Sequence, residues 1–106
     1  MAMKKYNKLI RDKIPQIIEQ DGKKCVVEKL NNESYIDHLN LKLGEELSEY
    51  IESESVGELA DLVEVIYAIL DFKNISISEF EKIRVDKVDK RGAFKKRLIL
   101  KAVIED

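Results

Sequence analysis

The chain has 106 residues, with 19 lysines and arginines against 21 aspartates and glutamates, and a formal net charge of −2. This near balance gives no reason to expect a nucleic-acid polymer as partner, and the length favours one domain spanning 1–106. A single cysteine, Cys25, excludes an intramolecular disulfide and a cysteine-rich zinc site, and no stretch approaches the roughly 18 apolar residues of a membrane span. We therefore expect a cytoplasmic protein that binds no membrane.

The first third of the chain predicts a short helix and then a strand. Asp12 can cap a helix that runs to about Gln20, because Pro15 in the first turn needs no donor and Asp21 with Gly22 would end it. Residues 24–30 are partly β-branched and bounded by turn residues, which is typical of a strand. Residues 97–104 have a similar character. Since a lone strand leaves its backbone groups unpaired, we expect these two segments to pair.

A long amphipathic helix is predicted from about residue 33 to residue 52. Apolar side chains recur there every three or four residues, which defines a face toward the core; they are Ile36, Leu39, Leu43, Leu47 and Tyr50. Glu46 falls almost on this stripe, where a carboxylate is costly unless it is paired or bound to a cation.

Two further helices follow. One opens near Ser55, with Glu58 at a capping-box position, and runs through a nearly continuous apolar stretch to about Phe72. The other begins at Ser76 or Ser78 and extends toward Arg91, before Gly92 stops it. Because few residues separate the helices at 33–52 and 55–72, they should be antiparallel neighbours. The predicted fold is mainly α: an antiparallel helical hairpin core with a third helix and a small two-stranded β element near 24–30 and 97–104.

Two carboxylate pairs are the feature richest in chemistry. Glu46 and Glu49 are three residues apart on one predicted helix, and Glu58 and Asp61 are three apart on the next, so each pair shares a helix face. Converging acids repel one another and raise their own pKa values unless a cation compensates. Mg²⁺, with Mn²⁺ as an alternative, suits oxygen ligands and completes its shell with substrate phosphates.

Simpler interpretations exist for several charged residues. Glu45, Glu52 and Glu54 fit an ordinary solvated helix surface. Glu58 could serve a capping box with Ser55, and it would also suit the helix dipole in a first turn. A basic stripe of Arg84, Lys87 and Arg91 could form ordinary ion pairs or contact phosphate. The sequence contains neither a Walker-type loop nor a dinucleotide glycine motif, so phosphate binding would need metal and basic side chains.

The pattern E-E-x-x-E followed by E-x-x-D resembles the all-α nucleotide pyrophosphohydrolases, the MazG-like and phosphoribosyl-ATP pyrophosphohydrolase superfamily. The segments YNKLIRDKIP at 6–15 and KVDKRGAFKKR at 87–97 look like its small, house-cleaning branch. The resemblance implies that Glu46, Glu49, Glu58 and Asp61 bind magnesium, with Glu45 a lesser candidate. It also implies cleavage between the α and β phosphates of a nucleotide, and assembly from dimers.

The leading hypothesis is therefore a magnesium-dependent hydrolase that converts a nucleoside triphosphate to the monophosphate and pyrophosphate, acting as a homodimer or a dimer of dimers. Glu46 and Glu49 are the catalytic candidates, and Glu49 could orient the attacking water. Candidates for contacts to the nucleotide are basic and flank the acids; they are Arg11, Lys13, Lys87, Arg91 and Arg97. Two alternatives stay open: hydrolysis of phosphoribosyl-ATP, and a non-catalytic module for nucleotide binding or dimerisation.

Overall fold

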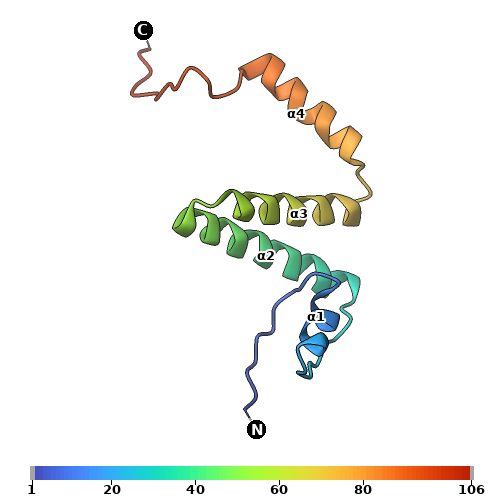
Figure 1. Ribbon diagram of the computed structural model, residues 1–106. Helices are drawn as coiled ribbons and strands as arrows, with labels where there is room; N and C mark the ends of the chain where they lie inside the picture. The colour runs from blue at the N-terminus through green and yellow to red at the C-terminus, as the bar shows by residue number, and fades with distance from the viewer. Residues whose placement is uncertain (1, 106) are drawn as a thin grey trace. The chain divides into compact units, whose positions relative to one another are not determined.

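The computed structural model describes residues 2–105 and shows four helices: α1 at Ile14–Gln20, α2 at Asn32–Ser53, α3 at Val56–Phe72 and α4 at Ile77–Arg91 (Figure 1). The chain divides after Asn74 into two compact units, the first holding α1 to α3 and the second holding α4. The mainly α prediction is confirmed. Across the described residues, no helix combines the length and apolar character needed to cross a membrane. A single domain spanning 1–106 stays a prediction.

Local side chains explain where the three longer helices begin and end. Asn31, Ser55 and Ser76 precede α2, α3 and α4, and each accepts a hydrogen bond from a backbone N–H in the first turn that would otherwise lack a partner. Glu54 takes a left-handed conformation with φ 56° and separates α2 from α3. Gly92 follows α4 with φ 81°, a conformation that glycine adopts without a Cβ clash. The predicted limits of these helices agree with the structure to within a residue or two.

The start of α1 differs from the prediction. Lys13, not Asp12, is the N-cap residue, and no side chain caps the helix. Pro15 lies in the first turn as expected, where its missing N–H costs nothing. The helix ends at Gln20 as predicted, and the turn at Asp21 and Gly22 follows it.

The predicted two-stranded β element was wrong. Residues 24–30 and 97–104 are irregular, and no strand occurs anywhere in residues 2–105. Val26 is 98% exposed and Ile104 is 92% exposed, so neither segment buries its apolar side chains. The preference of β-branched residues for strands largely reflects packing against neighbours on a sheet, and these segments have no such neighbours.

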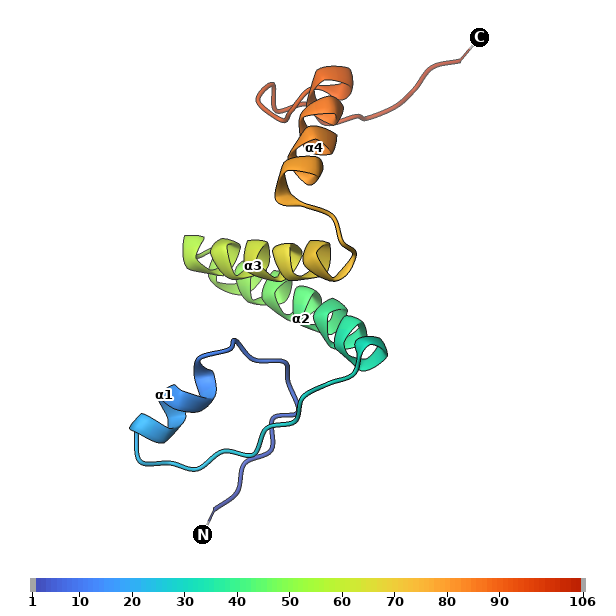
Figure 2. The ribbon, with the colours of Figure 1, turned by 90° about the vertical axis from the view of Figure 1, so that its right-hand side faces the viewer.

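The helical hairpin, formed by α2 and α3, is the structural centre of the first unit. The two helices lie side by side in both views (Figures 1 and 2) and run antiparallel, because only two residues connect them. The rings of Tyr35 and Phe72 meet edge to face with centroids 5.8 Å apart, which joins the start of α2 to the end of α3. Leu39, Val65 and Leu70 are buried between them.

One member of the predicted apolar stripe lies outside this interface. Leu47 is 48% exposed, whereas the adjacent Glu46 is only 6% exposed. The buried face of α2 therefore carries a carboxylate where a leucine was expected. This replacement places an acid inside the hairpin.

Candidate metal centre

The buried face of each hairpin helix changes from apolar to acidic along its length. On α2, Glu46 follows the buried Leu39 by seven residues, which is two turns along the same face. On α3, Glu58 precedes the buried Val65 by seven residues. Because the helices are antiparallel, both displacements lead toward the connected end of the hairpin. The two acidic ends therefore face each other.

The resulting acidic site contains two overlapping groups of carboxylates. Glu45, Glu46 and Glu49 form one group on α2, and Glu46 joins Glu58 and Asp61 of α3 in the other. Within each group, one carboxylate oxygen from every residue lies within 4.8 Å of the others. The four acids predicted to bind metal are thus divided between two groups that share Glu46.

Two oxygens in this site are buried without a hydrogen-bond partner among the described residues. They are Oε2 of Glu46 and Oε2 of Glu58, one from each helix. Burial raises the pKa of the Glu46 carboxyl, and the nearby charge of Glu49 raises it further. Buried polar atoms nearly always have partners, so these two oxygens are available to a ligand that supplies positive charge or a hydrogen bond.

The capping interpretation of Glu58 does not account for this residue. The hydroxyl of Ser55 accepts from the N–H of Gly57 at 3.2 Å, and the N–H of Ser55 donates to the hydroxyl of Ser53 at 3.1 Å. A capping box requires the Glu58 carboxylate to accept from that Ser55 N–H. The Ser55 N–H already donates to Ser53, so the Glu58 carboxylate does not form the capping box and is free to take part in the acidic site.

Three cations lie at the edge of the acidic site. The ammonium of Lys8 donates to Glu45 Oε1 at 3.0 Å, and the guanidinium of Arg11 donates to Asp61 Oδ1 at 2.6 Å. Lys42 Nζ lies 3.4 Å from Glu46 and 3.6 Å from Glu45. Five carboxylates against three cations leave two negative charges when every group is ionised. That remainder matches one divalent cation.

The cations also set the electrostatics of the edge. The hydrogen bond from Lys8 lowers the pKa of the Glu45 carboxyl, and the same bond raises the pKa of Lys8. The Lys42 contacts follow the helical spacing of three and four residues and could have been found from the sequence. Lys8 and Arg11 reach residues 37 and 50 positions away, which no local pattern indicates.

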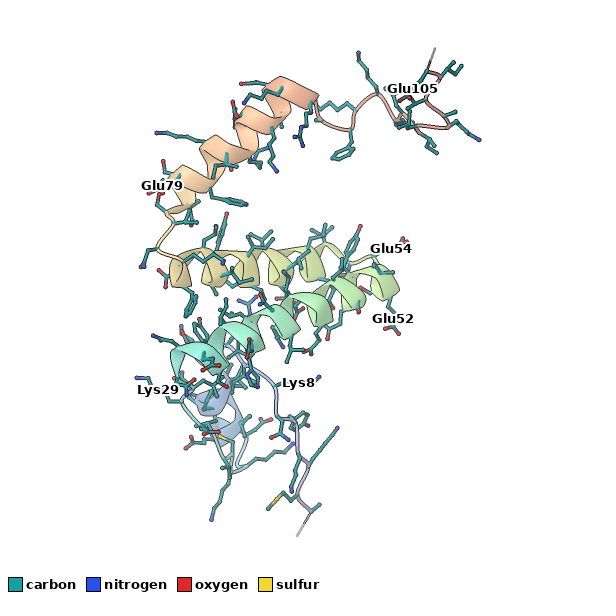
Figure 3. All side chains as sticks on the ribbon, turned by 180° about the vertical axis from the view of Figure 1, so that it is seen from behind. Lys8, Lys29, Glu52, Glu54, Glu79 and Glu105 are labelled. Carbon is teal, nitrogen blue, oxygen red and sulfur yellow. The ribbon has the colours of Figure 1, made fainter. Side chains whose placement is uncertain are left out.

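Two acids at the connected end of the hairpin belong to its ordinary solvated surface. Glu52 and Glu54 are exposed, and their side chains point away from the hairpin at its connected end (Figure 3). Glu45 is only partly exposed and is held by Lys8 and Lys42, so it belongs to the edge of the acidic site.

The other predicted nucleotide contacts lie elsewhere in the chain. Lys13 is the N-cap residue of α1. Lys87 and Arg91 lie on α4, and Arg97 follows it, so all three belong to the second unit. Arg84, on the same predicted stripe, pairs with Glu81 one turn before it, which fits the ordinary ion-pair interpretation. The roles of Lys13, Lys87, Arg91 and Arg97 stay predictions.

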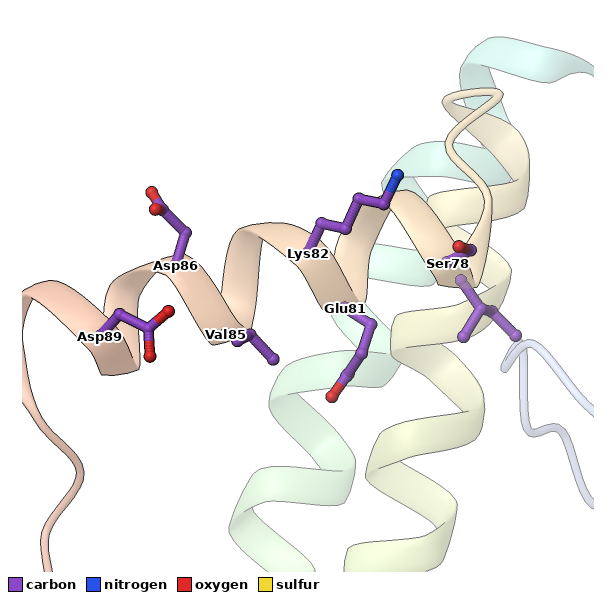
Figure 4. A pocket seen from close by; sticks show the side chains of 7 residues that line it. Ser78, Glu81, Lys82, Val85, Asp86 and Asp89 are labelled. Carbon is purple, nitrogen blue, oxygen red and sulfur yellow. The ribbon is translucent and has the colours of Figure 1, made fainter.

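A concave surface of about 690 Å³ also follows one side of α4 (Figure 4). Its lining runs from Ile77 to Asp89 on that single helix, and two of its acids, Glu81 and Asp86, pair with Arg84 and Lys90. This surface offers neither a buried polar group nor converging acids among the described residues. The acidic site of the hairpin is therefore the stronger candidate.

The donor set of the acidic site fits magnesium better than a softer metal. Every candidate ligand is a carboxylate oxygen, and no histidine or cysteine belongs to either group. The oxygens of each group lie within 4.8 Å of one another, and side-chain rotation would have to bring them to the roughly 2.9 Å that separates adjacent ligands of an octahedral magnesium ion. No protein-family model, curated protein or solved structure matches this chain.

Proposed function

We propose that this protein is a magnesium-dependent nucleotide pyrophosphohydrolase, which converts a nucleoside triphosphate or related nucleotide to the monophosphate and pyrophosphate. The observation that carries the proposal is the pair of buried, unpartnered oxygens, Glu46 Oε2 and Glu58 Oε2, supplied by two different helices. The resemblance of the two acidic motifs and their flanking segments to the MazG-like superfamily supports the reaction type. House-cleaning of non-standard nucleotides is the role that this resemblance favours.

The proposed metal ligands are Glu46, Glu49, Glu58 and Asp61. All four are carboxylates near the connected end of the hairpin, and the side chain of Glu46 is fixed by burial. Magnesium held there would neutralise phosphate charge and help to orient the attacking water. Mn²⁺ has similar ligand preferences and is expected to substitute.

The protein side chains then perform the remaining tasks. Glu49 is less buried than Glu46, so it can orient a water molecule and accept its proton. The water oxygen bonds to one phosphorus of the α–β phosphoanhydride, and the bond from that phosphorus to the bridging oxygen breaks. Pyrophosphate and the monophosphate are the products. Arg11, whose guanidinium lies at the edge of the site against Asp61, is the proposed contact to phosphate oxygens.

Pyrophosphate release tests the proposal directly. A panel of standard and modified nucleoside triphosphates, with phosphoribosyl-ATP included, is incubated with the protein and magnesium. We expect Glu49→Gln and Asp61→Asn to lower the rate by at least about a hundredfold, whereas Glu52→Gln, an exposed acid on the same helix, retains the wild-type rate. Equal rates in all four proteins would contradict the assigned roles. Preference for phosphoribosyl-ATP would select that alternative substrate.

A non-catalytic module remains the contrasting function. Calorimetry that shows magnesium-dependent nucleotide binding, together with chromatography that shows no product, would favour it. Binding without turnover would leave the acidic site as a docking point for a nucleotide polyphosphate.

We further propose that the chain forms a homodimer or a dimer of dimers through α3. Four apolar side chains recur every three or four residues along one side of this helix: Val56, Leu59, Val63 and Tyr67. They are exposed by 77%, 38%, 41% and 37% in the single chain, which leaves a continuous apolar stripe beside the hairpin interface. A second copy carrying the same stripe can cover it through a symmetric contact.

A further inference from the structure

The basic segment at residues 8–11 crosses the rim of the acidic site and contacts both of its carboxylate groups. Lys8 binds Glu45 of the first group, and Arg11 binds Asp61 of the second. Neither cation enters the buried part of the site, since their side chains are 50% and 57% exposed. Glu46 Oε2 and Glu58 Oε2 therefore remain unpartnered although two cations lie nearby.

Arg11 binds a carboxylate that the proposed metal also needs. Its guanidinium donates to Asp61 Oδ1 at 2.6 Å, and Asp61 is one of only two α3 carboxylates in the cluster. A guanidinium and a divalent cation repel each other, and a carboxylate oxygen that binds one is weakened as a ligand for the other. Metal binding and the Arg11–Asp61 contact are thus in competition.

We propose that Lys8 and Arg11 act as built-in counter-cations of the acidic site, which a divalent metal displaces, and that the displaced Arg11 then binds substrate phosphate. This inference rests on the proposed metal site and adds an order of events to it. Before metal binds, the two side chains reduce repulsion among the acids. Once metal binds, Arg11 loses its carboxylate partner and is available to a phosphate group at the same rim.

The exposure of the two side chains makes this exchange feasible. An ion pair between largely exposed groups contributes little net stability, so a divalent cation can separate it without unfolding the segment. The planar guanidinium of Arg11 also suits phosphate as well as carboxylate, since both accept paired hydrogen bonds. Arg11 is therefore a substrate-binding residue whose partner, carboxylate or phosphate, depends on the metal.

Calorimetry on the full chain tests the exchange with two simple probes, Mg²⁺ alone and inorganic pyrophosphate added to the magnesium-loaded protein. Arg11→Gln should bind Mg²⁺ about two- to fivefold more tightly than wild type, because a competing cation is gone. The same variant should bind pyrophosphate at least about fivefold more weakly. Opposite changes for the two probes are the signature of the exchange.

Two further variants complete the design. Lys23→Gln removes one positive charge from an exposed residue of the same unit that forms no ion pair in the described chain, so it controls for net charge. Lys8→Gln should tighten Mg²⁺ binding in the same direction as Arg11→Gln, which keeps the test open if one variant misfolds. Tighter Mg²⁺ binding in both variants relative to Lys23→Gln supports the proposal.

The possible outcomes distinguish failure of this inference from failure of the proposed metal site. If wild type binds Mg²⁺ but Arg11→Gln and Lys8→Gln bind it no more tightly than Lys23→Gln does, the exchange is overturned and the metal site stands. If Arg11→Gln weakens both probes, Arg11 is structural or assists the metal, and the exchange is again overturned. If wild type does not bind Mg²⁺, the proposed metal site fails and this inference fails with it.

Discussion

Replacing Glu46 with leucine should stabilise the metal-free protein and remove its response to magnesium. The side chain is 6% exposed, one of its oxygens has no partner, and burial raises its pKa. Removing an unsatisfied buried polar group gains about 1–3 kcal/mol, whereas losing the Lys42 ion pair costs less than about 1 kcal/mol. The net expectation for Glu46→Leu is a gain of about 1–2 kcal/mol in the free energy of unfolding.

Magnesium should reverse the order of the two proteins. At a Mg²⁺ concentration a hundred times the dissociation constant, a ligand that binds only the folded state stabilises it by about 2.7 kcal/mol, which exceeds the expected advantage of Glu46→Leu. Wild type should gain this amount and Glu46→Leu should gain almost none, since it lacks the ligand shared by both carboxylate groups. Urea unfolding followed by far-ultraviolet circular dichroism, with and without MgCl₂ at constant ionic strength, measures both effects.

Glu52→Leu is the matched control, because it makes the same substitution at an exposed position of α2. Its stability should stay within about 0.5 kcal/mol of wild type, and magnesium should stabilise it as it does wild type. Glu46→Leu that is less stable than wild type in the absence of metal would refute the conclusion that this carboxylate is strained by burial. Equal stabilisation of all three proteins by magnesium would refute its role as a ligand.

Three further predictions concern the pKa of Glu46, the cap of α3 and the exposed apolar stripe of α3. The pKa of Glu46 lies above its ordinary value of 4.5, so just above that pH the folded state binds more protons than the unfolded state. The melting temperature should therefore fall as pH rises through this interval. Added Mg²⁺ should remove the fall, as thermal melts would show. Ser55→Ala should lower the free energy of unfolding by about 1 kcal/mol through loss of the α3 cap. Glu58→Gln should not lower it in metal-free protein. Equal losses for the two variants in urea titrations would show that Glu58 does take part in capping. Val63→Glu should convert an oligomer to monomer in sedimentation experiments, and an unchanged mass would place the interface elsewhere.

The parts of the fold that sequence could predict are those fixed by neighbouring residues. Ser55 and Ser76 cap the helices that follow them, and Gly92 ends α4, because each acts on backbone groups within one turn. The acidic pairs were predictable for the same reason, since helical spacing and a short connection place them on facing surfaces. The two irregular segments show the limit: Val26 favours a strand by its shape, but a strand forms only where a partner is available.

The sequence could predict that these acids lie near one another, but it could not predict the cations that pair with them. Glu46 could be singled out because it interrupts an apolar stripe, and that interruption is visible in one sequence. The partner of Arg11 depends on how the basic segment returns to the hairpin, over a separation of 50 residues. Asn7 contributes to this path with a left-handed conformation at φ 50°, immediately before Lys8, and asparagine tolerates that conformation better than most residues.

The acidic site also replaces apolar contact at the connected end of the hairpin. Facing positions that would pair leucine with valine near the connected end instead pair Glu46 with Glu58, which removes apolar contact and adds charge repulsion. Two facing acids at these positions lower the stability of the metal-free fold, and packing alone gives no reason for them to be there. The arrangement becomes favourable when a divalent cation supplies the missing charge, because binding energy is then added to folding energy. The connected end of the hairpin is therefore where stability should depend most on metal, and the Tyr35–Phe72 end is where it should depend least.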